Sequence, residues 1–377
     1  MTEQHDVIVI GGGAIGCSTA YFLRSEGLKV ALVDKGEVGK EASWASAGII
    51  GPGSLSEGDP WFLQATKLSK QLYDELNADL FEQTGVWVGY GGQGTMILAL
   101  SEEEGEAAKV QAKQEISAGL PLEILMGPEA RRRESGLPEN LMAAILYPQS
   151  RFLDARNYTG TIAKAAQGKG VTIRQGWPVT AMVWQGRQVV GVRSGPSQLL
   201  ANWVINAAGA WAGYLDPKLT APIIPDHGQI MSLHGPTSGL RHTLFRWNSY
   251  GYITPRIDGR VVVGATHEEI GFQKKVTASG LRYLVGIVKR VLPGIMDQPM
   301  IDIWSGLRPT TPDGLPIVGP DPRVKEGYLW AAGHSSSGMM QAPATGKVLT
   351  DLVLLRKPCI PIDKVKVDRF LQTDESF

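Results

Sequence analysis

The chain has 377 residues, carries 37 Lys and Arg against 37 Asp and Glu, and contains two cysteines. The balanced charge excludes a general electrostatic attraction to nucleic acid or anionic lipid, so we expect a small-molecule partner. Cys17 and Cys359 provide no disulfide framework and no thiol metal cluster, which favours a cytoplasmic protein without a metal site. The length exceeds that of a usual single domain and predicts two lobes.

Membrane and targeting signals are the next class that the sequence excludes. No apolar run approaches the roughly 20 residues needed to span a bilayer. Residues 1–5 are polar and a strand-like segment follows at once, so we expect neither a cleaved leader nor an integral membrane segment. At most we expect peripheral attachment to a membrane.

The first 34 residues carry the strongest local signal. Residues 6–10 (DVIVI) form an apolar, β-branched run that predicts a strand buried on both faces of a parallel sheet. The motif G-x-G-x-x-G follows at 11–16, and 17–25 repeats apolar residues at helical intervals. A second strand-like run, 29–33, ends on Asp34. Strand, glycine turn, helix and second strand in this order predict a dinucleotide-binding unit rather than a glycine-rich surface turn.

Each glycine of this motif has its own physical reason. Gly11 permits the tight turn, Gly13 lets backbone N–H groups approach a pyrophosphate, and Gly16 lets the helix pack on the strand. The helix N-terminus adds a partial positive charge. Asp34 can accept hydrogen bonds from a ribose diol and would repel a 2′-phosphate, so we expect an adenosine with a free 2′-hydroxyl.

Residues 36–54 are mostly small and have almost no periodicity. Such a segment cannot form a core, and it is either an ordinary loop or a channel that a flat ligand approaches closely. Because it follows the dinucleotide motif, we predict that Ser43, Ser46, Ala47 and Gly48 line a cofactor channel.

We interpret residues 59–133 as a structural scaffold. We predict an amphipathic helix over 59–84, two strands around a glycine-rich turn within 86–100, and a helix over 102–118. The basic triplet 131–133 lies beside glutamates and is interpreted as a solvated helix face rather than a binding patch.

Two further strand-to-glycine junctions follow. The buried run 203–206 leads into the segment 207–211 (AAGAW), which begins with small residues, and a similar run from 328 leads into Gly333 and His334. Backbone could again meet a cofactor at both places. Around them we predict helices and strands at these positions: a helix over 152–167, strands at 170–175, 178–185 and 188–194, and a closing helix over 344–355.

Residues 221–266 change character. Strand-like segments at 230–234, 251–255 and 260–265 are separated by turns, and a helix is predicted over 281–292. This pattern indicates a mostly antiparallel sheet, a different layer from the parallel opening, and we interpret it as the substrate lobe. The fold class predicted is therefore α/β, α+β overall: a Rossmann-like parallel-sheet domain plus a second domain with a mostly antiparallel sheet.

Two C-terminal motifs join the N-terminal fingerprint in a family resemblance. With SGLRPTTPDGLPIVG at 305–319 and AAGHSSSGMMQAPATG at 331–346, the chain resembles the D-amino acid oxidase superfamily of flavoproteins over about residues 5–355. Within it the chain looks most like glycine oxidases and next like D-amino acid dehydrogenases. The resemblance implies a discontinuous FAD-binding domain at 1–84, 146–220 and 305–377, and a substrate-binding domain at 85–145 and 221–304.

The resemblance also implies the cofactor contacts. Non-covalent FAD would lie on the fingerprint, along the small-residue segment and against the last helix, whose N-terminus would face the pyrimidine edge of the flavin. Val179 would contact adenine through its backbone. The implied residues are Gly11, Gly13, Ala14, Ile15, Gly16, Asp34, Lys35, Ser43, Ser46, Ala47, Gly48, Val179, Gly209, Gly338, Met339 and Met340.

For the substrate, Arg308 matches the family arginine that grips a carboxylate, and Tyr252 matches the tyrosine that assists it. A guanidinium offers the planar fork that pairs with both carboxylate oxygens. The alternatives are a structural salt bridge and a core tyrosine. Further candidates for the pocket are Ile50, Trp247, Asn248, His267, His334 and Ser336.

One position departs from the family. Ser336 stands where relatives often carry a second arginine, which predicts a pocket that admits a bulkier or N-substituted amine. No acid–base pair is evident in the sequence.

The implied reaction is oxidative deamination of a small amino acid such as glycine, sarcosine or a D-amino acid. Hydride would pass from the α-carbon to flavin N5, giving an imino acid that water converts to a 2-oxo acid and ammonia. The electron acceptor is O₂, giving H₂O₂, or a quinone or other acceptor, as in a D-amino acid dehydrogenase associated with a membrane. Two classes without this chemistry stay open, namely a non-catalytic or tRNA-modifying FAD-binding subunit and an NAD-only dehydrogenase. Homo-oligomerisation is also left open.

Overall fold

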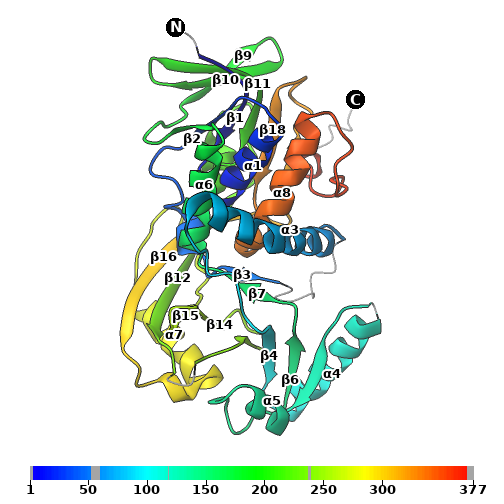
Figure 1. The fold of residues 1–377 in the computed structure, drawn as a ribbon, viewed down its shortest axis with the longest axis vertical. Coiled ribbons are helices and arrows are strands. Elements are labelled where there is room, and N and C mark those ends of the chain that lie inside the picture. The colour runs from blue at the N-terminus through cyan, green and yellow to red at the C-terminus, as the bar shows by residue number, and fades with distance from the viewer. Residues whose placement is uncertain (1–2, 52–59, 118, 237–238, 372–377) are drawn as a thin grey trace.

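The computed structural model describes residues 3–51, 60–117, 119–236 and 239–371. Two eight-stranded sheets form the framework, and helices cover them (Figure 1). Asp59, which opens the predicted helix over 59–84, lies outside the described residues. The helices are α1 (Ala14–Ser25), α2 (Ala42–Ala45), α3 (Pro60–Thr84), α4 (Glu102–Ser117), α5 (Gly127–Arg133), α6 (Ala155–Gly168), α7 (Ala278–Val291) and α8 (Gly338–Val353).

The first sheet carries the dinucleotide-binding unit. Its strands run in the order β17 (Ile317–Pro320), β18 (Tyr328–Ala332), β11 (Ser197–Asn206), β1 (Glu3–Ile10), β2 (Val30–Val33) and β8 (Thr172–Arg174). Neighbours from β18 to β8 are parallel, so the carboxyl ends of β18, β11, β1 and β2 lie at one edge. Antiparallel strands β10 (Gln188–Ser194) and β9 (Ala181–Gln185) extend from β11.

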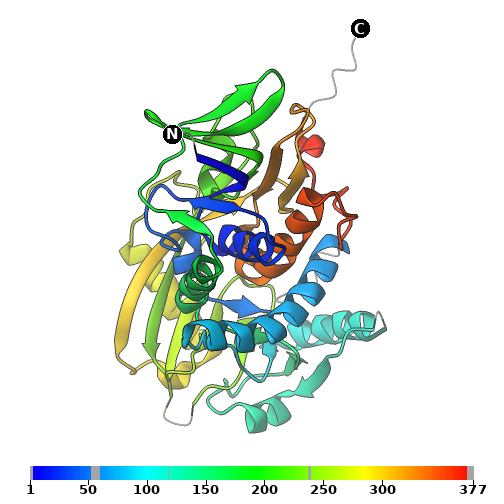
Figure 2. The same ribbon diagram turned by 45° about the horizontal axis from the view of Figure 1, so that its top comes forward.

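Burial on both faces explains the apolar run of β1. Val7 and Val9 point into the core that α1, α6 and α8 form with the sheet. Ile8 and Ile10 point the other way, into the core shared with β9 and β10. Since successive strand residues face opposite sides, a strand covered on both faces needs a continuous apolar sequence. The helical layer on the first face is seen in Figure 2.

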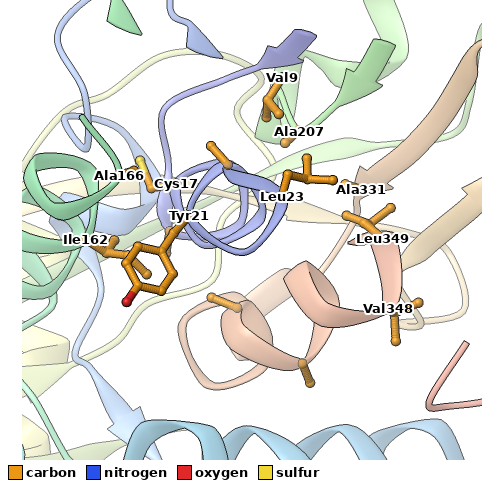
Figure 3. Packing of buried hydrophobic residues seen from close by; sticks show 14 of the residues in the cluster. Val9, Cys17, Tyr21, Leu23, Ile162, Ala166, Ala207, Ala331, Val348 and Leu349 are labelled. Atoms are coloured by element: carbon orange, nitrogen blue, oxygen red, sulfur yellow. The ribbon is translucent and has the colours of Figure 1, made fainter. Parts of the chain in front are cut away.

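Helix α1 lies at the centre of this layer. Figure 3 shows α1 between α6 and α8, with Cys17 and Tyr21 directed toward Ile162 and Ala166. The Ser18 hydroxyl lies 3.0 Å from the Tyr158 hydroxyl of α6. This packing fixes the helix whose N-terminus follows the glycine turn.

The second sheet is mostly antiparallel. Its order is β16 (Met300–Thr310), β12 (Ile224–His234), β15 (Arg260–Gly264), β14 (Tyr252–Pro255), β13 (Thr243–Arg246), β4 (Thr95–Ala99), β6 (Ala143–Tyr147) and β5 (Glu123–Met126). Only the β13–β4 pair within this order is parallel. Apolar side chains such as Ile253 and Val263 pack on α7 from one face. Side chains of the other face, such as Tyr252 and Arg308, line a large cavity.

The fold class is confirmed: a parallel-sheet unit and a mostly antiparallel sheet occur in one chain. The division into two domains remains a proposal, and two strands cross its boundaries. β16 pairs with β12 along most of its length, so residues 305–310 lie in the second sheet. β6 likewise continues past residue 145 to Tyr147.

Two predicted elements are wrong in their details. Residues 86–100 contain one strand, β4, because the glycine-rich stretch before it makes only an isolated bridge from Gly91 to Phe152. Phe152 itself belongs to β7 (Arg151–Phe152), which pairs with β3 (Ile49–Ile50). Helix α6 therefore begins at Ala155, where the Asp154 carboxylate accepts the N–H groups of residues 156 and 157.

Helix α8 begins six residues before the predicted position 344, with Pro343 inside it. Proline lacks an N–H, so the carbonyl of Met339, four residues earlier, loses its helical donor. The Tyr73 hydroxyl of α3 donates to that carbonyl at 2.5 Å. A tertiary hydrogen bond thus replaces the missing backbone one, which explains why the proline does not end the helix.

The small-residue segment 36–54 has more structure than predicted in its described part. It contains α2 and the short strand β3. Within the described ranges, no helix is long and apolar enough to cross a membrane. In the same ranges, no three His, Cys, Asp or Glu side chains are grouped to hold a metal ion.

Candidate active site

A cavity of about 1250 Å³ is lined by residues of both sheets. Its walls include Gly11 after β1, Ala207 after β11 and His334 after β18. The three strand-to-glycine junctions of the sequence thus meet at one edge of the parallel sheet, where ligands of such sheets bind. From the other side, β12, β14 and β16 contribute Gly228, Tyr252 and Arg308.

The N-terminus of α1 opens onto this cavity. Gly13 is the N-cap of α1, and the N–H of Ala14 donates to the Ser43 hydroxyl at 2.8 Å. Gly11 has φ +101°, and a Cβ there would lie 2.3 Å from the Ala207 carbonyl oxygen. The turn therefore requires glycine, and it leaves helix N–H groups and a partial positive charge facing the cavity.

Asp34 lies at the end of β2 beside this turn. Its carboxylate accepts the N–H of Gly12 at 2.7 Å and the N–H of Gly36 at 2.8 Å. Two backbone donors fix the side chain in place at the cavity wall. This position suits a carboxylate that receives hydrogen bonds from a ribose diol.

Lys35 also lines the cavity, with Nζ 2.9 Å from the centroid of the Trp211 ring. Burial lowers the pKa of Lys35, and the neighbouring Glu41 carboxylate, 3.7 Å away, opposes that effect. Val179, the predicted adenine contact, lies on the cavity wall, as does Trp177. The residues predicted to contact the adenosine half of the cofactor therefore share this cavity with Asp34.

Most of the predicted cofactor residues line this one cavity. They are Gly11, Gly13, Ala14, Ile15, Asp34, Lys35, Ser43, Ser46, Ala47, Gly48, Val179, Gly209, Gly338, Met339 and Met340. Gly16 does not line it, because its Cα packs against the turn: a Cβ there would lie 1.9 Å from the Gly11 carbonyl oxygen. Its role is close packing of helix on strand, as the motif predicts.

Not all of the predicted substrate-pocket residues line the cavity. Trp247, His334 and Ser336 line the cavity, as do Asn248 and His267. Ile50 does not: its side chain is 1% exposed and belongs to the core beneath the cavity wall, so this prediction is wrong.

His334 is buried and holds the Thr345 hydroxyl through Nε2 at 3.0 Å. Burial lowers the pKa of His334 to about 3, so the imidazole stays neutral. It therefore fixes the segment that leads into α8 rather than supplying a charge. Ser336, two residues on, is exposed at the cavity wall.

Arg308 extends from β16 over the neighbouring strand β12. Its Nη1 donates to the Asp226 carboxylate and to the Thr266 carbonyl oxygen, both at 3.1 Å. At Gly228 a Cβ would lie 2.4 Å from Nη2, so glycine is needed to make room for the guanidinium. With Nη1 engaged, Nε and Nη2 remain as a two-donor edge for a carboxylate.

Tyr252 reaches toward the same region from β14. Its ring crosses β15 above Gly264, where a Cβ would lie 2.3 Å from the hydroxyl. Burial raises the pKa of Tyr252 to about 12, although the positive charges of Arg308 and Arg256 lower it. The phenol therefore stays protonated and can donate a hydrogen bond beside Arg308.

Two side chains that hold parts of the cavity wall are not predicted from the sequence. Arg256 is 8% exposed and donates to the carbonyls of Ala47 and Pro255, which fastens the cofactor segment to the second sheet. Burial lowers its pKa to about 10. Asp226 pairs with Arg308, and Asp226 also accepts a hydrogen bond from His267. The only local signal was their position at or beside strand ends.

The donors and the glycine turns fit FAD. The α1 N-terminus suits a pyrophosphate, Asp34 a ribose, and the α8 N-terminus at Gly338 the electron-rich edge of a flavin. Neither cysteine lines the cavity, so neither lies where it could bond to a cofactor held there. A dinucleotide-binding cavity that faces an arginine and a tyrosine fits a flavin-dependent oxidoreductase.

Comparisons with known proteins identify the family. The model of a family described as FAD dependent oxidoreductase matches residues 6–352. A glycine oxidase of Bacillus licheniformis is 30% identical, with 94% of each chain covered, and one of Pseudomonas putida is 31% identical, with 96% and 97% covered. The solved glycine oxidase of Geobacillus kaustophilus has a TM-score of 0.93 at 29% identity over 98% of this chain and 100% of that one.

The chain therefore belongs to the FAD-dependent oxidoreductases of the D-amino acid oxidase family. It is an enzyme that uses FAD and is similar to glycine oxidases. The predicted resemblance and cofactor are confirmed.

Proposed function

We propose that this enzyme oxidises a small α-amino acid, such as glycine, sarcosine or a D-amino acid, to the corresponding imino acid. Water then hydrolyses the imine to the 2-oxo acid and ammonia, or to the 2-oxo acid and a primary amine when the substrate is N-substituted. The observation that carries the proposal is the placement of Arg308 and Tyr252 on the wall of the cavity that also holds the glycine junctions. The similarity to glycine oxidases supports it.

The two side chains have separate tasks in the proposed reaction. The Nε and Nη2 edge of Arg308 binds the substrate carboxylate, and the Tyr252 hydroxyl donates to the same group. Two fixed contacts orient the α-C–H bond, which lowers the entropic part of the barrier. Bound FAD supplies the hydride acceptor at N5.

We propose O₂ as the electron acceptor, with H₂O₂ as product, and a cytoplasmic location. The similarity to proteins named as oxidases supports the first, and two free cysteines support the second. A D-amino acid dehydrogenase that uses another acceptor is the second candidate. The exposed Ser336 at the cavity wall is compatible with the larger substrates of such an enzyme, because a pocket without an arginine there has room for larger side chains.

Anaerobic mixing of the purified yellow protein with glycine, sarcosine and a panel of D- and L-amino acids tests the proposal. We expect bleaching of the flavin by at least one small amino acid, then rapid recolouring and peroxide when air is admitted. Bleaching by larger D-amino acids with slow recolouring would favour the dehydrogenase. No bleaching by any member of the panel would contradict amino acid oxidation.

Replacing Ser336 by arginine should narrow the substrate range. A guanidinium at this place on the cavity wall would occupy space in the cavity and add a positive charge to it. We expect the ratio of kcat/KM for glycine to that for D-alanine or larger D-amino acids to rise about tenfold, or about 1.4 kcal/mol. Steady-state peroxide assays measure it, with Ser279→Arg as the control, because Ser279 lies exposed on α7 and does not line the cavity. An unchanged ratio would show that Ser336 does not set pocket breadth.

A further inference from the structure

An Asp–His pair lies beside the carboxylate site, and its histidine has no task in the reaction described so far. His267 follows β15 and lines the cavity, whereas Asp226 lies on β12 behind it with a side chain 13% exposed. The His267 Nδ1 is 2.8 Å from the Asp226 Oδ2. A carboxylate that holds one ring nitrogen of a cavity-lining histidine is a common arrangement for proton transfer.

The hydrogen bond fixes the tautomer of His267. An ionised carboxylate can only accept, so Nδ1 carries the proton and Nε2 is left with a free lone pair when the ring is neutral. Burial alone would raise the pKa of Asp226, but the hydrogen bond from His267 and the charge of Arg308 together hold it below its usual value. Asp226 therefore stays ionised and keeps Nε2 as the proton acceptor.

The pair also places His267 close to the carboxylate anchor. Arg308 Nη1 and His267 Nδ1 contact the same oxygen of Asp226, at 3.1 and 2.8 Å. The two nitrogens are thus within about 6 Å of each other. An α-amino acid carries its amine two bonds from its carboxyl carbon, so a substrate whose carboxylate binds Arg308 presents its amine inside the cavity that His267 also lines.

We propose that His267 is a further catalytic residue, whose Nε2 accepts a proton from the α-ammonium group of the bound substrate, with Asp226 as its positioning residue. This inference rests on the proposed function. The substrate N–H bond breaks, its proton goes to Nε2, and the electron pair stays on nitrogen. That pair is then available to form the C=N bond, and the bound FAD would supply the acceptor for the α-hydrogen and its two electrons. The positive charge that the ammonium group loses passes to the His267 ring with the proton. His267 releases this proton to solvent after the product leaves.

The groups around His267 are compatible with this role. The Tyr250 ring packs on the imidazole with centroids 4.8 Å apart. Glu268, the next residue, directs its Oε1 to Gln229 and to the Thr266 hydroxyl, so it is engaged away from the ring. Asp226 is negative and Arg308 positive, so one charge of each sign faces His267 from β12 and β16.

The test compares His267→Gln with the wild-type holoenzyme in anaerobic single turnovers with glycine or sarcosine, whichever reduces the wild-type flavin faster. The rate constant of flavin reduction is measured from about pH 6 to about pH 10. At the acidic end we expect the variant to be about 100-fold slower, the usual size of a general-base effect. Toward pH 10 the difference should shrink, because the substrate amine is then already neutral.

A second readout separates catalysis from structure. Acetate has a carboxylate and no amine, and its binding is followed by the shift of the flavin absorption. We expect its Kd to change less than about threefold in His267→Gln, because Arg308 is intact. His234→Gln is the matched control, since His234 lies at the exposed end of β12 and does not line the cavity. His267→Asn serves as a second variant.

The outcomes are distinct. A variant that is slower by the same factor at every pH, or that loses acetate binding in parallel, would overturn the role of His267 as proton acceptor. So would a variant as fast as wild type throughout. If no amino acid reduces the wild-type flavin, the proposed function is wrong, and the role of His267 that rests on it is wrong as well.

Discussion

Replacing Arg308 by alanine is expected to reduce kcat/KM for carboxylate substrates by at least about 100-fold, largely through KM, while the FAD content of the protein stays near normal. The guanidinium is the charged partner of the substrate carboxylate, and removing one member of a partly buried, hydrogen-bonded charge pair typically weakens binding by about 2–5 kcal/mol. In this variant Asp226 also loses its hydrogen bond from Arg308, which adds to the effect. Steady-state kinetics and the flavin-to-protein absorbance ratio measure the two quantities.

Two controls sharpen this prediction. Arg308→Lys keeps the charge but not the planar fork, so we expect it to recover only part of the affinity. Arg260→Ala removes an arginine of the same sheet that pairs with Asp258 at 2.7 Å and does not line the cavity. It should leave KM within about threefold. Unchanged turnover of carboxylates in Arg308→Ala would show that another group anchors the substrate.

The second large effect is expected at Gly13. Gly13→Ala should leave the apoprotein folded but weaken FAD binding by at least about 100-fold, or about 2.7 kcal/mol. Gly13 has φ −77°, which alanine adopts freely, and the nearest atom to a Cβ is the Ser43 hydroxyl at 3.1 Å. The methyl group would instead occupy the space at the α1 N-terminus that the pyrophosphate approaches. Titration of apoprotein with FAD by flavin fluorescence measures the Kd.

A glycine elsewhere provides the control for this substitution. Gly160 lies in α6, and a Cβ there meets nothing within 4 Å. Gly160→Ala should keep the FAD affinity and stabilise the protein by up to about 1 kcal/mol, since alanine favours the helix. Normal FAD affinity in Gly13→Ala would show that the pyrophosphate does not bind at this turn. Loss of the folded apoprotein, by contrast, would show that Gly13 is needed for packing.

The parts of the site that the sequence predicts are local. The fingerprint, the acid at the end of β2 and the three junctions all rest on residues close together in the chain, where glycine spacing and strand ends carry the signal. The parallel order of β18, β11 and β1 then brings the junctions to one edge. Gly16 shows that the motif also predicts a packing role correctly.

The contacts that the sequence does not predict depend on how strands that are distant in the chain pair with each other. Asp226 meets Arg308 only because β12 and β16 pair with these two residues opposite each other, 82 positions apart in the chain. Arg256 similarly reaches the carbonyl of Ala47 from a distant strand. Ile50 is predicted in the pocket, whereas β3 turns its side chain into the core. Local sequence does not determine which residues of two distant strands lie opposite each other.

The most direct test of the account is the anaerobic flavin reduction rate with a substrate deuterated at the α-carbon. With glycine, or the amino acid that bleaches the enzyme fastest, we expect the deuterated form to reduce the flavin several-fold more slowly in a single turnover. That result would place cleavage of the α-C–H bond in the step that reduces FAD. Equal rates for the two isotopic forms, in a turnover that is not limited by binding, would contradict hydride transfer from the α-carbon in this cavity.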